Sequence, residues 1–254
     1  MNQSIKRSIL ALDFDGVLCD GMKEYFSSSW AVYGQIWSGQ RTAPDGLFEQ
    51  FTTLRPAIEH GWEMPLLVWA LMQSQHIQPE AWSDLVPELL VSSGYQPAQI
   101  AAAMDEVRDQ AIKTDLAGWL DLQRCYPGTV DRLNALPADI YPVIITTKDG
   151  RFTRQLLESQ GINLPADAIY GKEMRQSKAD TLLQLLPTAA NVWFVEDRLP
   201  TLYSIVSQPD LADVELFLAD WGYNTAAERL TANQDPTITL LSLDDFNRQE
   251  PEQW

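Results

Sequence analysis

The chain has 254 residues, of which 45% are hydrophobic and 21% are charged. This is the balance of a globular protein, and it excludes disorder as the general state. The 13 glycines show no period, which excludes a collagen-like chain. No apolar run approaches the roughly 20 residues of a membrane helix, and the first residues do not resemble a secretory signal peptide. The length favours one large domain, or a core with a second module.

Acidic residues outnumber basic ones by 35 to 18, which leaves a formal net charge of −17. Such a chain repels nucleic-acid phosphates and anionic membranes, so we expect neither as a partner. An anionic substrate would need a local cation or a metal ion. The two cysteines, Cys19 and Cys125, are too few for a disulfide framework, and neither lies in a CxxC pair. We therefore expect a reducing compartment, the cytoplasm.

The first predicted strand, Ser8–Leu12, is a short apolar run that ends at Asp13. The segment from Cys19 to Arg124 shows helical periodicity instead, and it contains six of the nine tryptophans. We expect an inserted helical module with its own aromatic core. Its predicted helices are Gly46–Leu54, Pro65–Ser74, Pro79–Val91 and Pro97–Leu122.

Strands and helices alternate again after Tyr126, Pro127 and Gly128, which predicts an α/β fold with a doubly wound parallel sheet. The predicted strands are Tyr141–Thr146, Asn191–Val195, Leu216–Ala219 and Ile238–Leu241, and the predicted helices are Thr129–Leu136, Phe152–Gln160 and Lys178–Leu186. The first strand belongs to the same sheet, so we expect a core of residues 1–18 and 124–254 with residues 19–123 inserted. The acidic tail from Asp244 is expected to fray.

Polar residues follow three of these strands, at the sheet edge where parallel sheets bind ligands. The first strand is followed by Asp13, Phe14, Asp15 and Gly16, the second by Thr147 and Lys148 after Thr146, and the third by Glu196 and Asp197. Lys178 begins the helix that leads to the third strand. The sequence therefore predicts four carboxylates, a hydroxyl and a lysine at one edge.

These segments, in this order, resemble the four motifs of the haloacid dehalogenase superfamily of phosphatases. Leu12–Asp20 resembles the first motif, Ile144–Lys148 the second, Lys178 the third, and Val195 with Glu196 and Asp197 the fourth. The turn at Tyr126–Gly128 and the loop Trp221–Asn224 resemble those of phosphoglycolate-phosphatase-like members, whose helical insertion is a cap domain.

The resemblance implies Mg²⁺-dependent hydrolysis of a small phosphorylated metabolite. It assigns Asp13 as the nucleophile that forms an aspartyl-phosphate, and Asp15 as the acid and base. The implied metal ligands are Asp13, the carbonyl oxygen of Asp15, Asp197 and Glu196. The implied phosphate-binding groups are the hydroxyl of Thr146, the amides of Asp15, Gly16 and Thr147, and the ammonium of Lys178. An anionic attacker requires this neutralisation, because a phosphate ester is itself an anion.

The chain departs from the family pattern at two motifs. A second acid often follows the fourth motif by four residues, where this chain has Thr201, and the third motif often contains prolines that are absent after Lys178. Lys172 is a rival for the role of the active-site lysine. Neither histidine, His60 or His76, has a catalytic partner at suggestive spacing, which argues against histidine-based chemistry.

Alternatives to this phosphatase are a phosphosugar mutase of the same fold and a catalytically idle interaction protein. A dehalogenase is disfavoured because Asp15 supplies an acid that dehalogenases lack. Substrate discrimination is expected from the inserted module, with Arg55 as the best-placed cation and Lys23, Arg41 and Trp62 as further candidates. The physiological substrate and the oligomeric state do not follow from the sequence.

Overall fold

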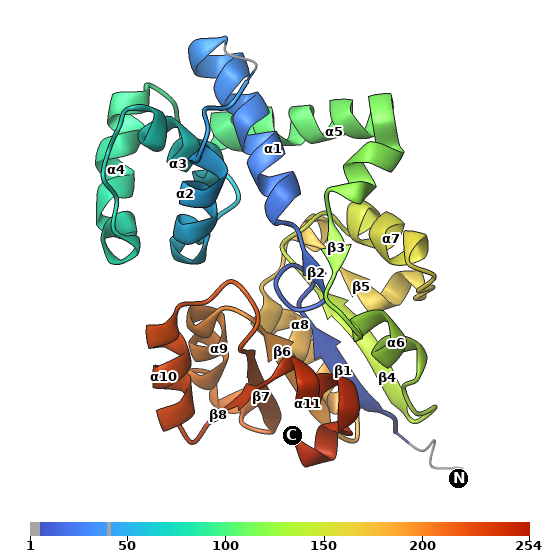
Figure 1. The fold of residues 1–254 in the computed structure, drawn as a ribbon. Helices are drawn as coiled ribbons and strands as arrows, with labels where there is room; N and C mark the ends of the chain where they lie inside the picture. The colour runs from blue at the N-terminus through green and yellow to red at the C-terminus, as the bar shows by residue number, and fades with distance from the viewer. Residues whose placement is uncertain (1–5, 40–41) are drawn as a thin grey trace. The chain divides into compact units, whose positions relative to one another are not determined.

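A computed structural model describes residues 6–39 and 42–254 of the chain (Figure 1). Its internal contacts divide the chain into two compact units. The first unit comprises the residues up to Asp20 together with Arg124–Trp254, and the second comprises Gly21–Gln123. The chain therefore leaves the first unit after Asp20 and re-enters it at Arg124. The predicted insertion began at residue 19, so the observed one begins two residues later, and both end at residue 123.

Six strands of the described residues form one parallel sheet in the first unit, in the order β5-β4-β1-β6-β7-β8. Their bounds are β1 Ser8–Leu12, β4 Ile140–Ile145, β5 Ile169–Tyr170, β6 Val192–Glu196, β7 Val214–Ala219 and β8 Ile238–Leu241. Two further short strands, β2 (Cys19–Asp20) and β3 (Arg124–Cys125), pair antiparallel where the chain leaves and re-enters this unit. The predicted parallel α/β sheet is confirmed.

Alternate residues of the central strands are buried on opposite sides of the sheet, because helices cover both of its faces. Ile9 and Ala11 of β1 share one apolar core with side chains of α8 and α9, and Leu10 and Leu12 are fully buried on the other face. The helices of the first unit are α6 Thr129–Asn134, α7 Gly150–Ser159, α8 Lys178–Leu185, α9 Leu199–Val206, α10 Ala226–Gln234 and α11 Leu243–Arg248.

The expectation that the tail frays from Asp244 is wrong. Helix α11 begins at Leu243, and the side chain of Phe246 within it is fully buried. The ring of Trp254 lies 5.2 Å from the ring of Phe217 and 5.5 Å from that of Phe246, measured between centroids. Aromatic burial therefore holds the tail, and the acidic residues beside it do not prevent this.

The second unit is helical, as the periodicity predicts. Its helices are α1 Met22–Tyr33, α2 Leu47–Leu54, α3 Glu63–Met72, α4 Trp82–Ser93 and α5 Pro97–Asp121. Helix α1 was not predicted, and a π-helical turn, Gly34–Ser38, follows it. Helix α5 is interrupted at Asp115, whose backbone angles are not helical. Aromatic contacts such as Trp37 with Trp69 and Tyr95 give this unit an aromatic core of its own.

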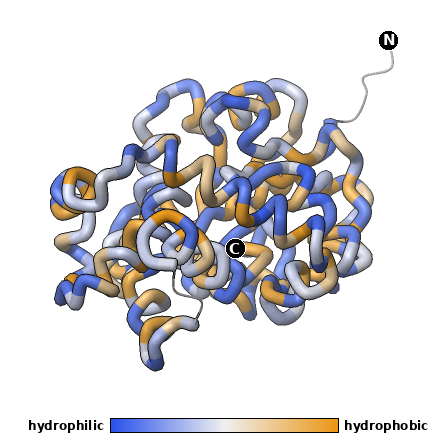
Figure 2. Tube along the Cα trace, turned by 90° about the horizontal axis from the view of Figure 1, so that it is seen from above, coloured by the Kyte–Doolittle hydropathy of each residue, from blue (hydrophilic) through white to orange (hydrophobic). Residues whose placement is uncertain are grey.

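Hydrophobic stretches are short and interrupted by hydrophilic residues along the whole trace (Figure 2). Among the described residues, no helix combines the length and the apolar character that a membrane span requires.

Candidate active site

The loop after β1 carries two carboxylates and a glycine that the site requires. The amide of Asp13 donates to Val195 O at 2.9 Å, so Asp13 is still held by the neighbouring strand. Asp13 therefore lies at the carboxyl-terminal edge of the sheet. Gly16 has a positive φ of 94°, and a Cβ at this position would collide with the carboxylate of Asp197. Glycine is therefore needed here both for its backbone conformation and for the close approach of Asp197.

Three carboxylates lie together at this edge. One oxygen each of Asp13, Glu196 and Asp197 falls within 4.8 Å of the others, and all three residues are buried. Glu196 is the last residue of β6 and Asp197 follows it, so the strand itself delivers both groups.

The loop after β7 holds Asp197 in place. The amide of Tyr223 donates to Asp197 Oδ2 at 2.7 Å, and the side-chain amide of Asn224 donates to the Asp197 carbonyl at 2.9 Å. A Cβ on Gly222 would collide with the Asp197 side chain, so this loop also needs a glycine. The Trp221–Asn224 segment was singled out in the sequence, but its role as the support of Asp197 was not predicted.

Lys178 neutralises part of this cluster. Its Nζ lies 2.9 Å from Asp13 Oδ1 and 2.6 Å from Glu196 Oε2. Ser177 and Asp180 form a capping box at the start of α8, which fixes the helix end that carries the lysine. The rival, Lys172, is exposed in a 3₁₀ turn. Lys178 is therefore ion-paired with two carboxylates of the cluster, those of Asp13 and Glu196.

The predicted phosphate-binding threonines lie beside the same lysine. Thr146 is buried, and its Oγ1 accepts a hydrogen bond from the Lys148 amide at 3.1 Å. Thr147 is exposed. A pocket of about 240 Å³ adjoins them, and its lining includes Thr146, Thr147, Lys172, Ser177 and Lys178.

Lys148 follows the end of a predicted strand, but the sequence predicted no role for it. Its Nζ lies 2.9 Å from Asp15 Oδ1 and 3.2 Å from Asp15 Oδ2, and it also lies 5.7 Å from the centre of the Phe14 ring. Only 9% of Lys148 is exposed. A lysine ammonium buried to this degree is held in place by its carboxylate partner. The only signal in the sequence was the position of Lys148, two residues after Thr146.

The burial of so many acids shifts their proton affinity. Burial raises the pKa of Asp13 to about 7, against the opposing effect of Lys178, and the nearby charges of Glu196 and Asp15 raise it further. Burial likewise raises the pKa of Glu196 to about 7, again opposed by Lys178 and reinforced by Asp197. Burial alone would lower the pKa of Lys178, but the charges of Asp13 and Glu196 outweigh it and raise that pKa.

The grouping of these carboxylates and their raised pKa values bear on whether the residues fit a divalent cation. Three buried carboxylates lie together, and Lys178 is ion-paired with two of them, Asp13 and Glu196. Carboxylate oxygens are the ligands that Mg²⁺ prefers, and a cation among them would favour their ionised forms. The donor set therefore fits a hard divalent metal ion.

The two predicted specificity residues lie in the second unit. The guanidinium of Arg55 lies 5.0 Å from the centre of the Tyr25 ring, and its Nη1 donates to the Ile58 carbonyl at 3.4 Å. The ring of Trp62 stacks on His60 with centroids 6.1 Å apart. Arg41 lies outside the described residues. The roles of Arg55 and Trp62 remain predictions.

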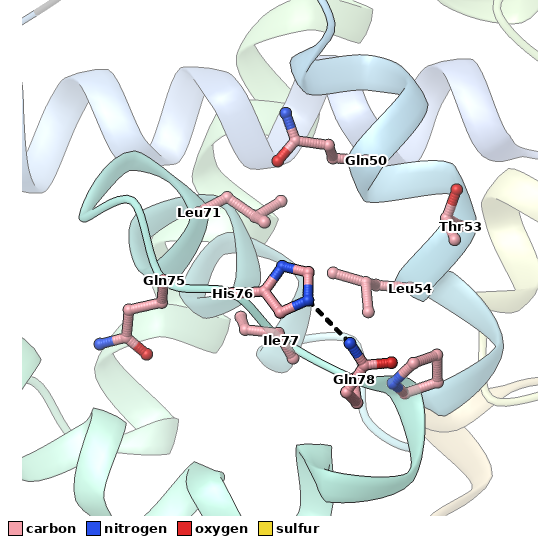
Figure 3. A pocket seen from close by; sticks show the side chains of 9 residues that line it. Gln50, Thr53, Leu54, Leu71, Gln75, His76, Ile77 and Gln78 are labelled. Carbon is pink, nitrogen blue, oxygen red and sulfur yellow. Dashed lines mark hydrogen bonds between the residues drawn. The ribbon is translucent and has the colours of Figure 1, made fainter.

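A second hollow, of about 270 Å³, lies within the second unit (Figure 3). It lies between α2 and the segment after α3, and glutamines, apolar side chains and His76 line it. His76 and Gln78 are hydrogen-bonded there at 2.9 Å. None of its lining residues is an aspartate, glutamate, lysine or arginine, so it lacks the charge that distinguishes the site at the sheet edge.

No model of a known protein family and no curated protein matches the sequence. Solved structures do match, at low identity. A predicted phosphatase from Clostridium acetobutylicum is 15% identical with a TM-score of 0.54, and the match covers 96% of this chain and 97% of the other. A haloacid dehalogenase-like hydrolase from Streptococcus pneumoniae is 19% identical with a TM-score of 0.53, over 92% and 93% of the two chains.

A predicted phosphoglycolate phosphatase from Haemophilus somnus is 14% identical, with a TM-score of 0.57 over 94% of each chain. At this identity the likeness concerns the fold and not the activity. It nevertheless spans nearly the whole of each chain, including the helical insertion. The chain therefore has the fold of the haloacid dehalogenase-like phosphatases and hydrolases.

Proposed function

We propose that the protein is a Mg²⁺-dependent phosphomonoester hydrolase that works through an aspartyl-phosphate on Asp13. The observation that carries this proposal is the cluster of Asp13, Glu196 and Asp197, buried together beside Lys178 at the carboxyl edge of the sheet. Proteins named as phosphatases share the fold, which supports the same reaction class.

Asp13, Asp197, Glu196 and the Asp15 carbonyl would hold the metal ion. Bound there, a Mg²⁺ ion would supply positive charge that offsets the repulsion between the phosphate and the carboxylate that attacks it. The grouping of three buried carboxylates supports this assignment, because they are costly to ionise together without a cation.

The residues of the chain would then divide the reaction between them. The Asp13 carboxylate attacks phosphorus, a new P–O bond forms, and the bond to the leaving oxygen breaks. Asp15 gives its proton to that oxygen. In the second step Asp15 takes a proton from the water that attacks the aspartyl-phosphate, which releases phosphate and restores Asp13.

The remaining residues would position the phosphoryl group. The hydroxyl of Thr146 and the amides of Asp15 and Thr147 would offer hydrogen bonds to its oxygens, and the Lys178 ammonium would balance its charge. The Gly16 amide, also assigned to the phosphate from the sequence, donates to the Cys19 carbonyl at 2.8 Å in this structure. Lys148, which contacts both oxygens of Asp15, would hold the proton donor in one orientation.

The division into two units supports a division of labour. We assign the reaction to the first unit and substrate discrimination to the helical second unit, with Arg55 and Trp62 as its specificity residues. The net charge of −17 argues against nucleic-acid and membrane partners. The two cysteines, too few for a disulfide framework, favour the cytoplasm.

The test is turnover of a panel of phosphomonoesters, including p-nitrophenyl phosphate and phosphorylated small acids, with Mg²⁺ and with excess chelator. We expect release of phosphate with Mg²⁺ and its loss on chelation. Borohydride reduction of enzyme quenched during turnover should convert residue 13 to homoserine, detected by mass spectrometry.

Absence of turnover across the panel with Mg²⁺ would refute the proposal and would favour an idle interaction protein. A hexose phosphate incubated with its bisphosphate separates the mutase alternative. Isomerisation without net phosphate release would identify a mutase.

A further inference from the structure

The two cysteines, 106 positions apart in the sequence, lie opposite each other in the fold. Cys19 of β2 pairs directly with Cys125 of β3, in the antiparallel ribbon through which the chain leaves and re-enters the first unit. They are the only cysteines of the chain, and both are free thiols. Their number and spacing alone predict no disulfide framework.

The geometry of the ribbon places these cysteines within reach of a disulfide. The Tyr126 amide donates to the Leu18 carbonyl at 3.0 Å, which makes the neighbouring pair, Cys19 and Cys125, a non-hydrogen-bonded pair. In such pairs the Cα atoms lie about 4.5 Å apart and the two side chains stand on the same face. A disulfide spans Cα separations of about 4.4–6.8 Å, so no rearrangement of the backbone is required.

The thiols differ in how easily they react. Cys19 is 1% exposed, whereas Cys125 is partly exposed. Burial raises the pKa of the Cys125 thiol to about 11. Cys125 is therefore the better attacking group, and reaction of the folded protein is slow.

We propose that Cys19 and Cys125 are a modification site that forms an intrachain disulfide with a low-molecular-weight disulfide as the oxidant. The Cys125 thiolate attacks one sulfur of the oxidant, giving a mixed disulfide and one released thiolate. The Cys19 thiolate then attacks the Cys125 sulfur, which forms the Cys19–Cys125 bond and releases the second thiolate. Two protein thiols are oxidised, one small disulfide is reduced to two thiols, and no other reactant is needed.

The disulfide would act on two parts of the molecule. It closes a covalent loop of chain that contains the whole second unit, since the chain leaves the first unit after Asp20 and returns at Arg124. It also restrains the loop that carries Asp15, because the Cys19 amide donates to Phe14 O at 2.9 Å and its carbonyl accepts the Gly16 amide at 2.8 Å. Closing so long a loop should raise the melting temperature, by at least about 5 °C.

The experiment uses the full chain, refolded from denaturant in buffers of oxidised and reduced glutathione at several ratios. Refolding exposes both thiols at the start, so slow access to Cys19 does not limit the outcome. Intact mass under non-reducing conditions, peptide mapping and the melting temperature are the readouts. Cys125→Ser and Cys19→Ser, which each keep one thiol, are the matched controls.

We expect a monomer lighter by two hydrogen atoms, a peptide that links Cys19 to Cys125, and the higher melting temperature, all reversed by dithiothreitol. Neither variant should show the shift in melting temperature. A glutathione adduct on either cysteine without the linked peptide, a disulfide between two chains, or two free thiols at every glutathione ratio would each overturn the proposal.

Discussion

Two groups of buried charges, one in each unit, are built in opposite ways. In the second unit the fully buried Glu24 meets one arginine, whose Nε and Nη2 lie 2.8 and 2.9 Å from its two oxygens. Ser28 adds a hydrogen bond at 2.6 Å. In the first unit, Lys178 is ion-paired with Asp13 and Glu196, Lys148 is ion-paired with Asp15, and Asp197 lies beside Asp13 and Glu196.

The difference distinguishes a structural ion pair from the candidate active site. Glu24 and Arg108 balance each other, so nothing further is needed to stabilise them. At the sheet edge three carboxylates are buried together, and burial raises the pKa values of Asp13 and Glu196 to about 7. Carboxylates buried together are costly to ionise in the free protein, and a bound cation would offset that cost.

The largest expected effect is on turnover. Asp13→Asn should lower kcat at least about 10³-fold, because an amide is not a nucleophile toward phosphorus, and this corresponds to about 4 kcal/mol in the barrier. Steady-state assays with p-nitrophenyl phosphate measure it, with the exposed Asp210→Asn as the matched control. A loss of less than tenfold, in a variant that melts as the wild type does, would remove Asp13 from the role of nucleophile.

The next effect concerns the balanced pair of the second unit. Arg108→Met should lower the free energy of unfolding by about 3 kcal/mol, because it leaves Glu24 buried without its partner. The double variant Glu24→Gln with Arg108→Met should recover part of this loss. Urea denaturation measures all three proteins. If the double variant is no more stable than the single one, the charge of Glu24 is not what the arginine compensates.

Mg²⁺ and pH should both change the stability of the protein through the carboxylate cluster at the sheet edge. Asp13 and Glu196 have folded-state pKa values of about 7, above their ordinary values of 3.8 and 4.5. The stability they contribute is therefore fully present below about pH 4 and is lost as the pH rises through 7. The metal-free protein should melt at a lower temperature at pH 8 than at pH 5.

Mg²⁺ should raise the melting temperature more at pH 8 than at pH 5, because its ligands must be ionised. At a hundredfold excess over its Kd it adds about 2.7 kcal/mol. Thermal melts at both pH values, with Mg²⁺ or with chelator, measure this. The double variant Asp13→Asn with Glu196→Gln should lose the response to Mg²⁺, and an unchanged response would place the metal elsewhere.

Lys148→Met should reveal whether Lys148 positions Asp15. We expect kcat to fall about 30-fold on alkyl phosphates, whose leaving oxygen needs a proton, and only a few-fold on p-nitrophenyl phosphate, whose leaving group does not. Lys148→Arg should restore part of the loss, and Lys113→Met, at an exposed position of α5, is the matched control. An equal loss on both substrate types would show that Lys148 is structural only.

The smallest effect tests the second unit as the source of specificity. Arg55→Ala should lower kcat/KM about tenfold on phosphomonoesters that carry a carboxylate, or about 1.4 kcal/mol, and leave p-nitrophenyl phosphate nearly unchanged. The position of Arg55 over Tyr25 suggests the control, Tyr25→Leu. If both classes of substrate lose activity equally, Arg55 serves the packing of its own unit.

Much of the fold follows from local patterns. The strand Ser8–Leu12 was predicted with the bounds observed, and Ile238–Leu241 likewise, because short apolar runs between turn residues have few other ways to be buried. Helix α10 was not predicted, although Thr225 and Glu228 form a capping box that announces it. The short strand Ile169–Tyr170 has no pattern of its own and forms only by pairing with β4.

The sequence by itself determined the chemistry that the sheet edge can hold. Asp13, Thr146, Lys178, Glu196 and Asp197 each lie at the end of a strand or the start of a helix. Parallel strands bring such ends together whatever their order. The residues of the cluster could therefore be named before any coordinates were known.

The tertiary structure alone decided which of these groups touch. The order of the strands puts β1 between β4 and β6, which sets Lys148 against Asp15 across 133 positions of sequence. The same folding lays Cys19 against Cys125 and the Tyr223 amide against Asp197. Contacts of this kind depend on how distant segments pack, and local periodicity carries no information about the partner of a given side chain.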